Sequence, residues 1–258
     1  MIGATEERRV DKLRIQIFDD SASLGRAAAQ FTATVVRDAV AARGSARVVL
    51  ATGNSQLGFV AALQDQAGVP WDAVTVFHLD EYLDLSAEHP ASFRRWIRER
   101  ITDPLRPAQV HYIEGDAPDP QAECRRYEEL LRAEPLDLVC MGIGENGHIA
   151  FNEPHQVDFA DDTWVRIIEL DHESRVQQVG EGHFGSVEET APRAITVTVP
   201  ALLSARALQV VVPELRKAPA VRATVYDEVS PACPATILRH QEHAVLLLDR
   251  QSASLLDS

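Results

Sequence analysis

The chain has 258 residues, a length typical of one α/β domain, so we expect a single domain over 1–258. Hydrophobic residues make up 45% and charged residues 25%, which excludes collagen-like, disordered and multi-pass membrane proteins. The formal net charge of −14 argues against a nucleic-acid partner, because such proteins need cations to neutralise phosphates. Because the net negative charge repels anions, binding of an anionic small molecule would need a local pocket of backbone N–H groups and a few cations.

The three cysteines and the N-terminal residues indicate the cellular compartment of the protein. Cys124, Cys140 and Cys233 form no C-x-x-C pair, which argues against a disulfide framework or a cysteine-rich zinc site. The first residues are charged where a signal peptide would be apolar, and polar residues interrupt the longest charge-free run, 48–64. We expect a soluble cytoplasmic protein with no membrane partner.

Short apolar runs alternate with longer amphipathic stretches, as in successive βα units. The pattern predicts a first strand over 14–18 and then a helix from Ser21 to Arg43, with Asp20 or Ser21 as N-cap and Gly44 as terminator. A loop to 163 and irregular chain over 171–191 are also expected. Further strands are predicted over 47–51, 74–79, 136–143, 165–170, 194–199, 208–212 and 244–248, and further helices over 55–67, 92–101, 121–133 and 217–226.

Several predicted strands are almost wholly apolar, which is typical of a parallel sheet covered on both faces. We therefore predict an α/β fold with a single doubly wound, mostly parallel sheet flanked by helices. In such sheets ligands bind beyond the carboxyl ends of the strands, so residues directly after a strand are the first candidates for a site.

The loop after the second predicted strand contains Thr52, Gly53, Asn54 and Ser55. Gly53 permits a left-handed conformation, and the N–H groups that follow would point outward at a helix N-terminus, so the loop could hold a phosphate. It lacks the lysine of a P-loop. A plain βα turn with Asn54 or Ser55 as N-cap is the structural alternative.

The strand over 74–79 ends in two consecutive acids, Asp80 and Glu81. A carboxylate at the rim of a pocket can act as a general base once burial adjusts its pKa. The alternative is that Asp80 caps the next turn while Glu81 is solvated.

The apolar strand ending near Ile143 is followed by a glycine-rich loop that carries His148 and, five residues later, Glu153. The loop matches G-x-G-x-x-G, but Pro154 stops a long helix and the motif lies mid-chain, so we reject dinucleotide binding. A histidine can move protons near neutral pH, and a carboxylate can orient it. The alternative is a histidine satisfied by a backbone carbonyl. Zinc and Ser-His-Asp catalysis find no support, since HExxH and G-x-S-x-G are absent.

Together these segments resemble the glucosamine-6-phosphate deaminase family of sugar-phosphate isomerases over nearly the whole chain. The motifs that carry the resemblance are L-A-T-G-N-S (50–55), F-H-L-D-E-Y (77–82), G-x-G-E-N-G-H-I-A-F-N-E-P (142–154), A-I-T-V-T-V-P-A-L-L (194–203) and L-R-K-A (215–218). The family converts glucosamine 6-phosphate and water to fructose 6-phosphate and ammonia, without a metal or an organic cofactor.

The resemblance implies a role for each matching residue. His148 would carry a proton between the ring oxygen and the anomeric hydroxyl while the pyranose opens, with Glu153 as its orienting partner. Asp80 would take the C2 proton and return a proton to C1. The phosphate would rest on the turn over 52–55 and on Lys217, and the remaining positions assigned to the substrate site are Glu81, Gly147 and Arg175.

The sequence departs from the family pattern in two places near the site. Asn146 stands where many members carry an aspartate that is thought to assist the histidine, and an asparagine can orient an imidazole but supplies no charge. Arg175 fits a family arginine, but the stretch 176–184 lacks a second phosphate-contacting arginine near Gly180. His183 could take its place.

A third departure concerns assembly and regulation. The hexameric, regulated members carry a serine and basic residues soon after Asn-Glu-Pro, where this chain has acids over 155–162. We therefore expect no activation by N-acetylglucosamine 6-phosphate and doubt a hexamer, leaving self-association open.

Three alternatives stay open. 6-Phosphogluconolactonase shares the fold, but its loops usually read Asp-Glu-Arg and Gly-Asp-Gly-His-x-Ala-Ser-Leu-Phe-Pro, whereas this chain has Tyr82 and Asn152-Glu153-Pro154. A sugar-phosphate-sensing module would carry a helix-turn-helix before the first strand, where only a short segment stands. A relative acting on another amino-sugar phosphate would agree with Asn146 and the 176–184 stretch.

Overall fold

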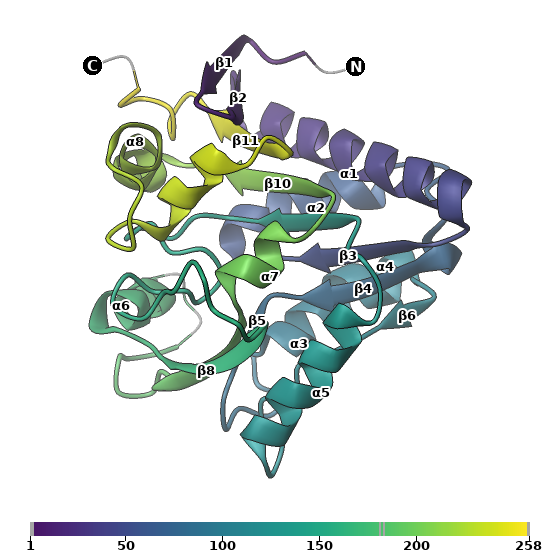
Figure 1. Cartoon of the computed structure of the whole chain (residues 1–258), viewed down its shortest axis with the longest axis vertical. Helices are drawn as coiled ribbons and strands as arrows, with labels where there is room; N and C mark the ends of the chain where they lie inside the picture. Colours follow the sequence, from purple (N-terminus) through teal and green to yellow (C-terminus); the bar gives the residue numbers. More distant parts are fainter. Residues whose placement is uncertain (1–2, 181, 183, 257–258) are drawn as a thin grey trace.

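The computed structural model describes residues 3–180, 182 and 184–256, and its strands form two sheets (Figure 1). The main sheet has eight strands in the order β1-β2-β11-β10-β7-β3-β4-β6. Their bounds are β1 Glu6–Val10, β2 Leu13–Phe18, β3 Ala46–Leu50, β4 Val74–His78, β6 Gln109–Val110, β7 Leu138–Met141, β10 Ala207–Val212 and β11 Ala244–Asp249.

The connectivity of the main sheet locates its ligand-binding edge. Every neighbouring pair from β2 to β6 is parallel, and only β1 pairs antiparallel, with β2. From β3 the chain first moves outward through β4 to β6, and then returns to the other side of β3 as β7. The strand order therefore reverses between β3 and β7, and such a switch point opens a crevice beyond the carboxyl ends of the strands.

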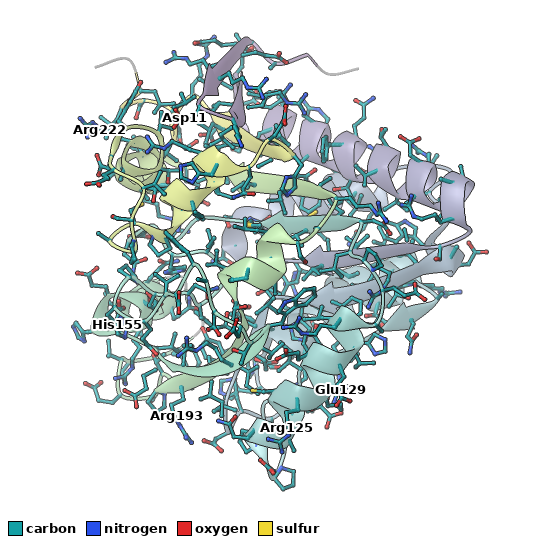
Figure 2. The ribbon with its side chains drawn as sticks, viewed as in Figure 1. Asp11, Arg125, Glu129, His155, Arg193 and Arg222 are labelled. Carbon is teal, nitrogen blue, oxygen red and sulfur yellow. The ribbon has the colours of Figure 1, made fainter. Side chains whose placement is uncertain are left out.

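Helices cover both faces of the main sheet, as predicted for a doubly wound fold. Alternate residues of one strand enter different cores: Leu246 and Leu248 pack on the side of α5, α7 and α8, whereas Val245 and Leu247 pack on the side of α1, α2 and α3. Exposed charged side chains such as Arg125 lie on the outside (Figure 2). The helices are α1 Ser21–Arg43, α2 Leu57–Gln64, α3 Phe93–Ile97, α4 Asp103–Leu105, α5 Pro120–Arg132, α6 His172–Gly180, α7 Val199–Leu203 and α8 Ala218–Tyr226.

The first predicted helix is confirmed together with both of its ends. The side chain of Asp20 accepts a hydrogen bond from Ser23 N–H, and Gly44 ends α1 in the left-handed region at φ 81°. The strand predicted before this helix is also confirmed as β2.

A second sheet of three antiparallel strands was not predicted. It has the order β5-β9-β8, with β5 Asp80–Tyr82, β9 Arg193–Val197 and β8 Val165–Glu169. The two predicted strands over 165–170 and 194–199 therefore exist, but they do not belong to the parallel sheet. Because β5 leaves β4 after a single residue, Leu79, the second sheet begins where the first one presents its carboxyl edge.

Two other expectations require correction. The segment before β2 forms the edge strand β1, and the chain over 171–191 is not irregular throughout, since it contains α6. The carboxylate of Asp171 begins this helix by accepting a hydrogen bond of 2.6 Å from Ser174 N–H. Within the described part of the chain, no helix combines the length and apolar character needed to cross a membrane.

Candidate active site

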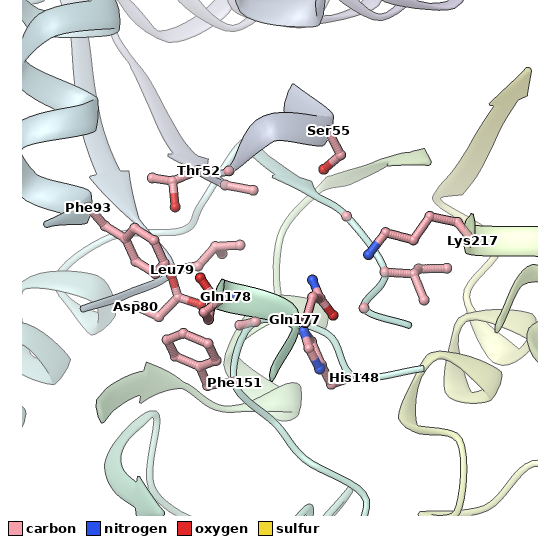
Figure 3. Close-up of a pocket in the computed structure, with 16 residues that line it drawn as sticks. Thr52, Ser55, Leu79, Asp80, Phe93, His148, Phe151, Gln177, Gln178 and Lys217 are labelled. Carbon is pink, nitrogen blue, oxygen red and sulfur yellow. The ribbon is translucent and has the colours of Figure 1, made fainter. Parts of the chain in front are cut away.

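A cavity of about 590 Å³, including its open mouth, lies at the carboxyl ends of β3, β4, β7 and β10. In Figure 3, Lys217 and Ser55 lie toward one end of the cavity and Asp80 and Phe93 toward the other. His148 lies between these ends. The lining residues are Ala51, Thr52, Gly53, Ser55, Leu79, Asp80, Phe93, Gly142, Ile143, Gly144, His148, Ala150, Phe151, Gln177, Gln178 and Lys217.

The turn after β3 forms one wall of the cavity. Thr52, Gly53 and Ser55 line it, and a short 3-10 turn over Asn54–Gln56 leads into α2. Gly53 has φ 97° and ψ 168°, a positive-φ conformation that favours glycine, although it is not the left-handed helical one we expected. Asn54 does not line this cavity but a separate surface pocket beside α1, so its contact with the ligand stays a prediction.

Lys217 supplies the cationic end of the cavity. It is the last residue of a 3-10 turn over Leu215–Lys217 that follows β10, and it is only 3% exposed. Its ammonium group points into the cavity (Figure 3). Among the described lining residues it is the only lysine or arginine, so it and the turn after β3 are the features suited to an anion.

Asp80 lies at the opposite end, as the first residue of β5. It is 7% exposed and lines the cavity. Burial raises the pKa of its carboxyl well above the ordinary value, and the charge of neighbouring Glu81 raises this pKa further. A carboxylate whose pKa is raised is a stronger base than an exposed one, so Asp80 is suited to remove a proton from carbon.

Glu81 has a different role from the one predicted. Successive side chains of a strand point to opposite faces, and Glu81 points away from the cavity and is fully buried. Its carboxylate accepts hydrogen bonds from the backbone N–H groups of Phe93 and Arg94 and from the Ser92 hydroxyl. Glu81 therefore fixes the start of α3, whose first residue, Phe93, lines the cavity.

Glycines shape the loop that carries His148. A Cβ added to Gly144 would lie 2.2–2.5 Å from atoms of the His148 ring, so this position leaves room only for glycine. The backbone closes the turn through a hydrogen bond of 2.9 Å from Gly144 N–H to the carbonyl of His148. Gly147, at φ 84°, does not line the cavity, and an added Cβ there would meet the sulfur of Cys233. Gly147 therefore has a packing role, and its substrate contact stays a prediction.

Behind His148 lies a small polar cluster around Glu153, which is fully buried. Nδ1 of His148 lies 3.6 Å from Oε2 of Glu153, and Nδ2 of Asn146 donates to the same oxygen at 2.8 Å. The hydroxyl of Ser174 donates to the other oxygen, Oε1. Asn146 does not contact the imidazole with its side-chain amide, since Oδ1 accepts from the backbone N–H of His148, so it acts on the histidine through Glu153.

The cluster keeps Glu153 ionised. Burial alone would raise the pKa of this carboxyl, but the attraction of His148 and the hydrogen bonds from Ser174 and Asn146 outweigh burial and lower it to about 2. An ionised Glu153 is an acceptor only, so it can hold the Nδ1 side of the imidazole while Nε2 is left for the cavity.

Arg175 does not reach the cavity. Its guanidinium donates to the backbone carbonyls of Val187 and Thr190, so it ties α6 to the chain that follows. Its substrate contact stays a prediction. The suggestion that His183 replaces a missing arginine lies outside the described residues.

Sequence reasoning missed three residues of α6 that belong to this region. Gln177 and Gln178 line the cavity, and the buried Oε1 of Gln178 has no hydrogen-bond partner among the described residues, which leaves it free for a ligand donor. Ser174 lies behind His148. The signal that was present is Asp171, a favoured N-cap residue followed by Glu173 in the first turn, which together mark the start of a helix.

No group of three or more histidine, cysteine, aspartate or glutamate side chains within the described ranges is arranged to hold a metal ion. The side chains that are present combine a raised-pKa carboxylate, a carboxylate-held histidine and a buried lysine around one cavity. A doubly wound fold with such a switch-point cavity defines the class of enzyme that moves protons on an anionic small molecule.

Comparison with known proteins places the chain within this class. Residues 19–247 match the family described as glucosamine-6-phosphate isomerases/6-phosphogluconolactonase, and the chain belongs to this family.

Relatives similar in sequence are glucosamine-6-phosphate deaminases. The one from Exiguobacterium sp. (strain AT1b) is 36% identical over 221 residues, which are 86% of this chain and 85% of the relative. The one from Bacillus cytotoxicus is 35% identical over 222 residues, covering 86% of this chain and 82% of the relative.

Two solved structures illustrate the fold. A monomeric glucosamine-6-phosphate deaminase matches with a TM-score of 0.85 and 28% identity, covering 93% of this chain and 99% of that one. A 6-phosphogluconolactonase from Shewanella baltica matches with a TM-score of 0.76 and 19% identity, and the match covers 94% of this chain and 97% of that one. The second likeness concerns the fold alone.

Proposed function

We propose that this protein is a glucosamine-6-phosphate deaminase, which converts glucosamine 6-phosphate and water to fructose 6-phosphate and ammonia. The observation that carries the proposal is the presence of two separate acid–base groups, Asp80 and the Glu153-held His148, in the lining of one cavity. The reaction needs one group to open the sugar ring and another to move a proton between two carbons. The names of the relatives at 35–36% identity support the same activity.

The proposed reaction begins with the closed sugar. Nε2 of His148 accepts the proton of the anomeric hydroxyl and delivers a proton to the ring oxygen, so the C1–O5 bond breaks and an open-chain aldehyde forms. Ionised Glu153 stabilises the imidazolium that exists between these two transfers.

Asp80 then moves a proton between carbons. Its carboxylate takes the C2 proton while a proton of the substrate's C2 ammonium group passes to O1, which gives an enolamine. Asp80 then returns a proton to C1, which gives the protonated ketimine at C2. Water adds to the ketimine and ammonia leaves, so the ketone of fructose 6-phosphate remains. Burial of Asp80 favours its protonated form, which makes the carboxylate a better base for this step.

The phosphate is assigned to the other end of the cavity. Lys217 provides the charge there, and Thr52, Gly53 and Ser55 provide a turn whose N–H groups and hydroxyls suit a phosphate. The separation of Lys217 from Asp80 in Figure 3 agrees with a substrate whose phosphate and C2 lie at opposite ends of a six-carbon chain.

6-Phosphogluconolactonase is the second candidate. The lactonase structures from Shewanella baltica and Thermotoga maritima are 19% and 20% identical to this chain, which concerns the fold alone, whereas the two relatives at 35–36% identity are named as deaminases. A lactonase hydrolyses an ester and has no carbon-bound proton to move, so the carboxylate of Asp80 would have no such task there.

The cellular location and the oligomeric state are part of the proposal. A cytoplasmic location fits a catabolic enzyme with no disulfide framework. The solved deaminase with 28% identity is described as monomeric, which supports the expectation that this chain does not form a regulated hexamer.

The test of the proposal is exchange of the C2 proton with solvent. Wild-type protein in ²H₂O should release ammonia and fructose 6-phosphate and should incorporate deuterium at C1 of the product. Asp80→Asn should lower exchange by about 10²–10⁴-fold, the usual contribution of a general base. Asp84→Asn, at a largely exposed position four residues on, is the matched control and should exchange like wild type. Exchange at the wild-type rate in Asp80→Asn would remove Asp80 from this role.

A further inference from the structure

Ser174 lies behind the imidazole of His148 and takes no part in the steps above. It is the third residue of α6 and is 1% exposed. Its hydroxyl donates to Oε1 of Glu153, and its Oγ lies 3.4 Å from Nδ1 of His148. The direct approach of Nδ1 to Oε2 of Glu153 is longer, 3.6 Å, so Oγ of Ser174 is the nearer acceptor, although both distances exceed the usual upper limit of about 3.2 Å for an N–H···O hydrogen bond.

We propose that Ser174 is a positioning residue that links His148 to Glu153 and thereby selects the tautomer of the imidazole. In this arrangement Nδ1–H of His148 donates to Oγ of Ser174, and the hydroxyl hydrogen of Ser174 donates to Oε1 of Glu153. The inference rests on the proposed function, because the selected tautomer matters only if His148 opens a sugar ring.

The direction of the hydrogen bonds follows from counting protons. A serine hydroxyl has one hydrogen to donate, and an ionised Glu153 can only accept, so the hydroxyl hydrogen is committed to the carboxylate. Oγ then faces Nδ1 with its lone pairs, and a neutral imidazole satisfies them only when its hydrogen is on Nδ1. Nε2 consequently presents a lone pair to the cavity, which is the form that accepts a proton from an anomeric hydroxyl.

Other polar groups near this cluster do not replace Ser174. Asn146 is occupied with Oε2 of Glu153 and with the backbone N–H of His148. Asp171 lies 3.4 Å from Nδ2 of Asn146 and 4.0 Å from Nδ1 of His155, and no contact joins it to the ring of His148. Within the described part of the chain, Ser174 therefore supplies the hydroxyl that contacts both His148 and Glu153.

The hydroxyl can be removed without removing the helix start. The backbone N–H of Ser174 is already held by the carboxylate of Asp171 at 2.6 Å, and this bond does not depend on the side chain. Ser174→Ala thus tests the hydroxyl, and Ser174→Thr restores it. Ser252→Ala is the matched control, because Ser252 is also fully buried and its hydroxyl bonds to the backbone of Asp249, outside the cavity.

The decisive readout is the tautomer of His148, measured by ¹⁵N NMR at a pH where the ring is neutral. We expect the Nδ1–H form in wild type, in Ser252→Ala and in Ser174→Thr, and a mixture of both tautomers in Ser174→Ala. In parallel, Ser174→Ala should lower kcat for glucosamine 6-phosphate about ten- to a hundred-fold, as for loss of one hydrogen bond to a charged group, and should change KM less than about threefold. Ser174→Thr should recover most of kcat.

The same set of measurements contains the outcomes that overturn the inference. An unchanged Nδ1–H tautomer in Ser174→Ala would overturn it, and so would an equal loss of kcat in the alanine and threonine variants, because the hydroxyl would then not be the cause. The NMR readout needs no turnover. If wild type released no ammonia, the proposed function would fail while the tautomer measurement would still decide the role of Ser174.

Discussion

Asp80 and Glu81 are adjacent acids at the start of β5, and only Asp80 lines the cavity. The sequence indicated a carboxylate at the end of β4, and the structure places Asp80 in the cavity. Glu81 was assigned to the same site, although the alternation of side chains along a strand allows only one of two neighbours to face it. Which of the two neighbours faces the cavity depends on the pairing of β5 with β9. This pairing joins segments distant in sequence, so the local sequence pattern did not predict it.

Lys217 allows the phosphate assignment to be tested at the residue scale. The chain contains only two lysines, and Lys217 is the buried one in the cavity. Lys217→Met should raise KM and lower kcat together, with kcat/KM reduced about ten- to a hundred-fold, since a charge-assisted hydrogen bond is lost and the bound phosphate helps orient the reacting carbons. Steady-state kinetics measure both constants.

The matched control is Lys12→Met, because Lys12 lies exposed in the turn between β1 and β2. This variant should behave as wild type. Equal kinetics in the Lys217 and Lys12 variants would contradict the phosphate assignment.

The low pKa of Glu153 predicts a pH-dependent contribution to stability. The folded-state pKa of about 2 lies below the ordinary value of 4.5, so ionised Glu153 stabilises the folded state above pH 4.5. This contribution is lost as the pH falls from about 4.5 toward 2. Glu153→Gln should therefore lower the free energy of unfolding at pH 7 by up to about 3 kcal/mol, and the difference from wild type should shrink at pH 4.

Urea unfolding at the two pH values measures this difference. Glu129→Gln, at an exposed position on α5, should differ from wild type by less than about 0.5 kcal/mol at both. If the difference in unfolding free energy between Glu153→Gln and wild type were the same at pH 7 and pH 4, the lowered pKa of Glu153 would be refuted.

At the scale of elements, the parallel sheet and the large helices followed from apolar runs and helix-end signals, as α1 with Asp20 and Gly44 illustrates. The elements that were missed lack such signals. The strand β1 reads EERRV, without apolar alternation, because charged side chains protect an exposed sheet edge. The helix α6 is short and polar, and four of its residues, His172 to Arg175, carry no apolar side chain.

The loop over Gly142–Asn152 makes the position of the histidine depend on one glycine. Because a Cβ on Gly144 would lie 2.2–2.5 Å from the His148 ring, Gly144→Ala should displace the ring and lower kcat by at least about tenfold, with a loss of stability of about 1–3 kcal/mol. Gly58→Ala in α2 is the control, since its nearest contact would be an ordinary 3.9 Å, and it should keep wild-type activity. Thermal unfolding and turnover measure both effects. Wild-type turnover in Gly144→Ala would contradict the described ring position.

At the scale of the whole molecule, a net charge of −14 surrounds a cavity that is assigned to an anion. The repulsion of an anion by this net charge is offset inside the cavity. The loops that follow separate strands bring one buried lysine and the turn after β3 to the switch point. The sequence indicated each of these loops. The arrangement of Ser174, Asn146 and Glu153 around one imidazole could not be predicted, because it depends on α6 packing beside a loop some twenty-five residues away.

Product analysis is the direct test of the proposed deaminase reaction. Purified protein is incubated with glucosamine 6-phosphate, and ammonia and fructose 6-phosphate are measured, while 6-phosphogluconolactone hydrolysis is followed in a parallel sample. We expect ammonia and fructose 6-phosphate in equal amounts, with no lactone hydrolysis above the uncatalysed rate. Lactone hydrolysis without any release of ammonia would show that the protein is not a deaminase.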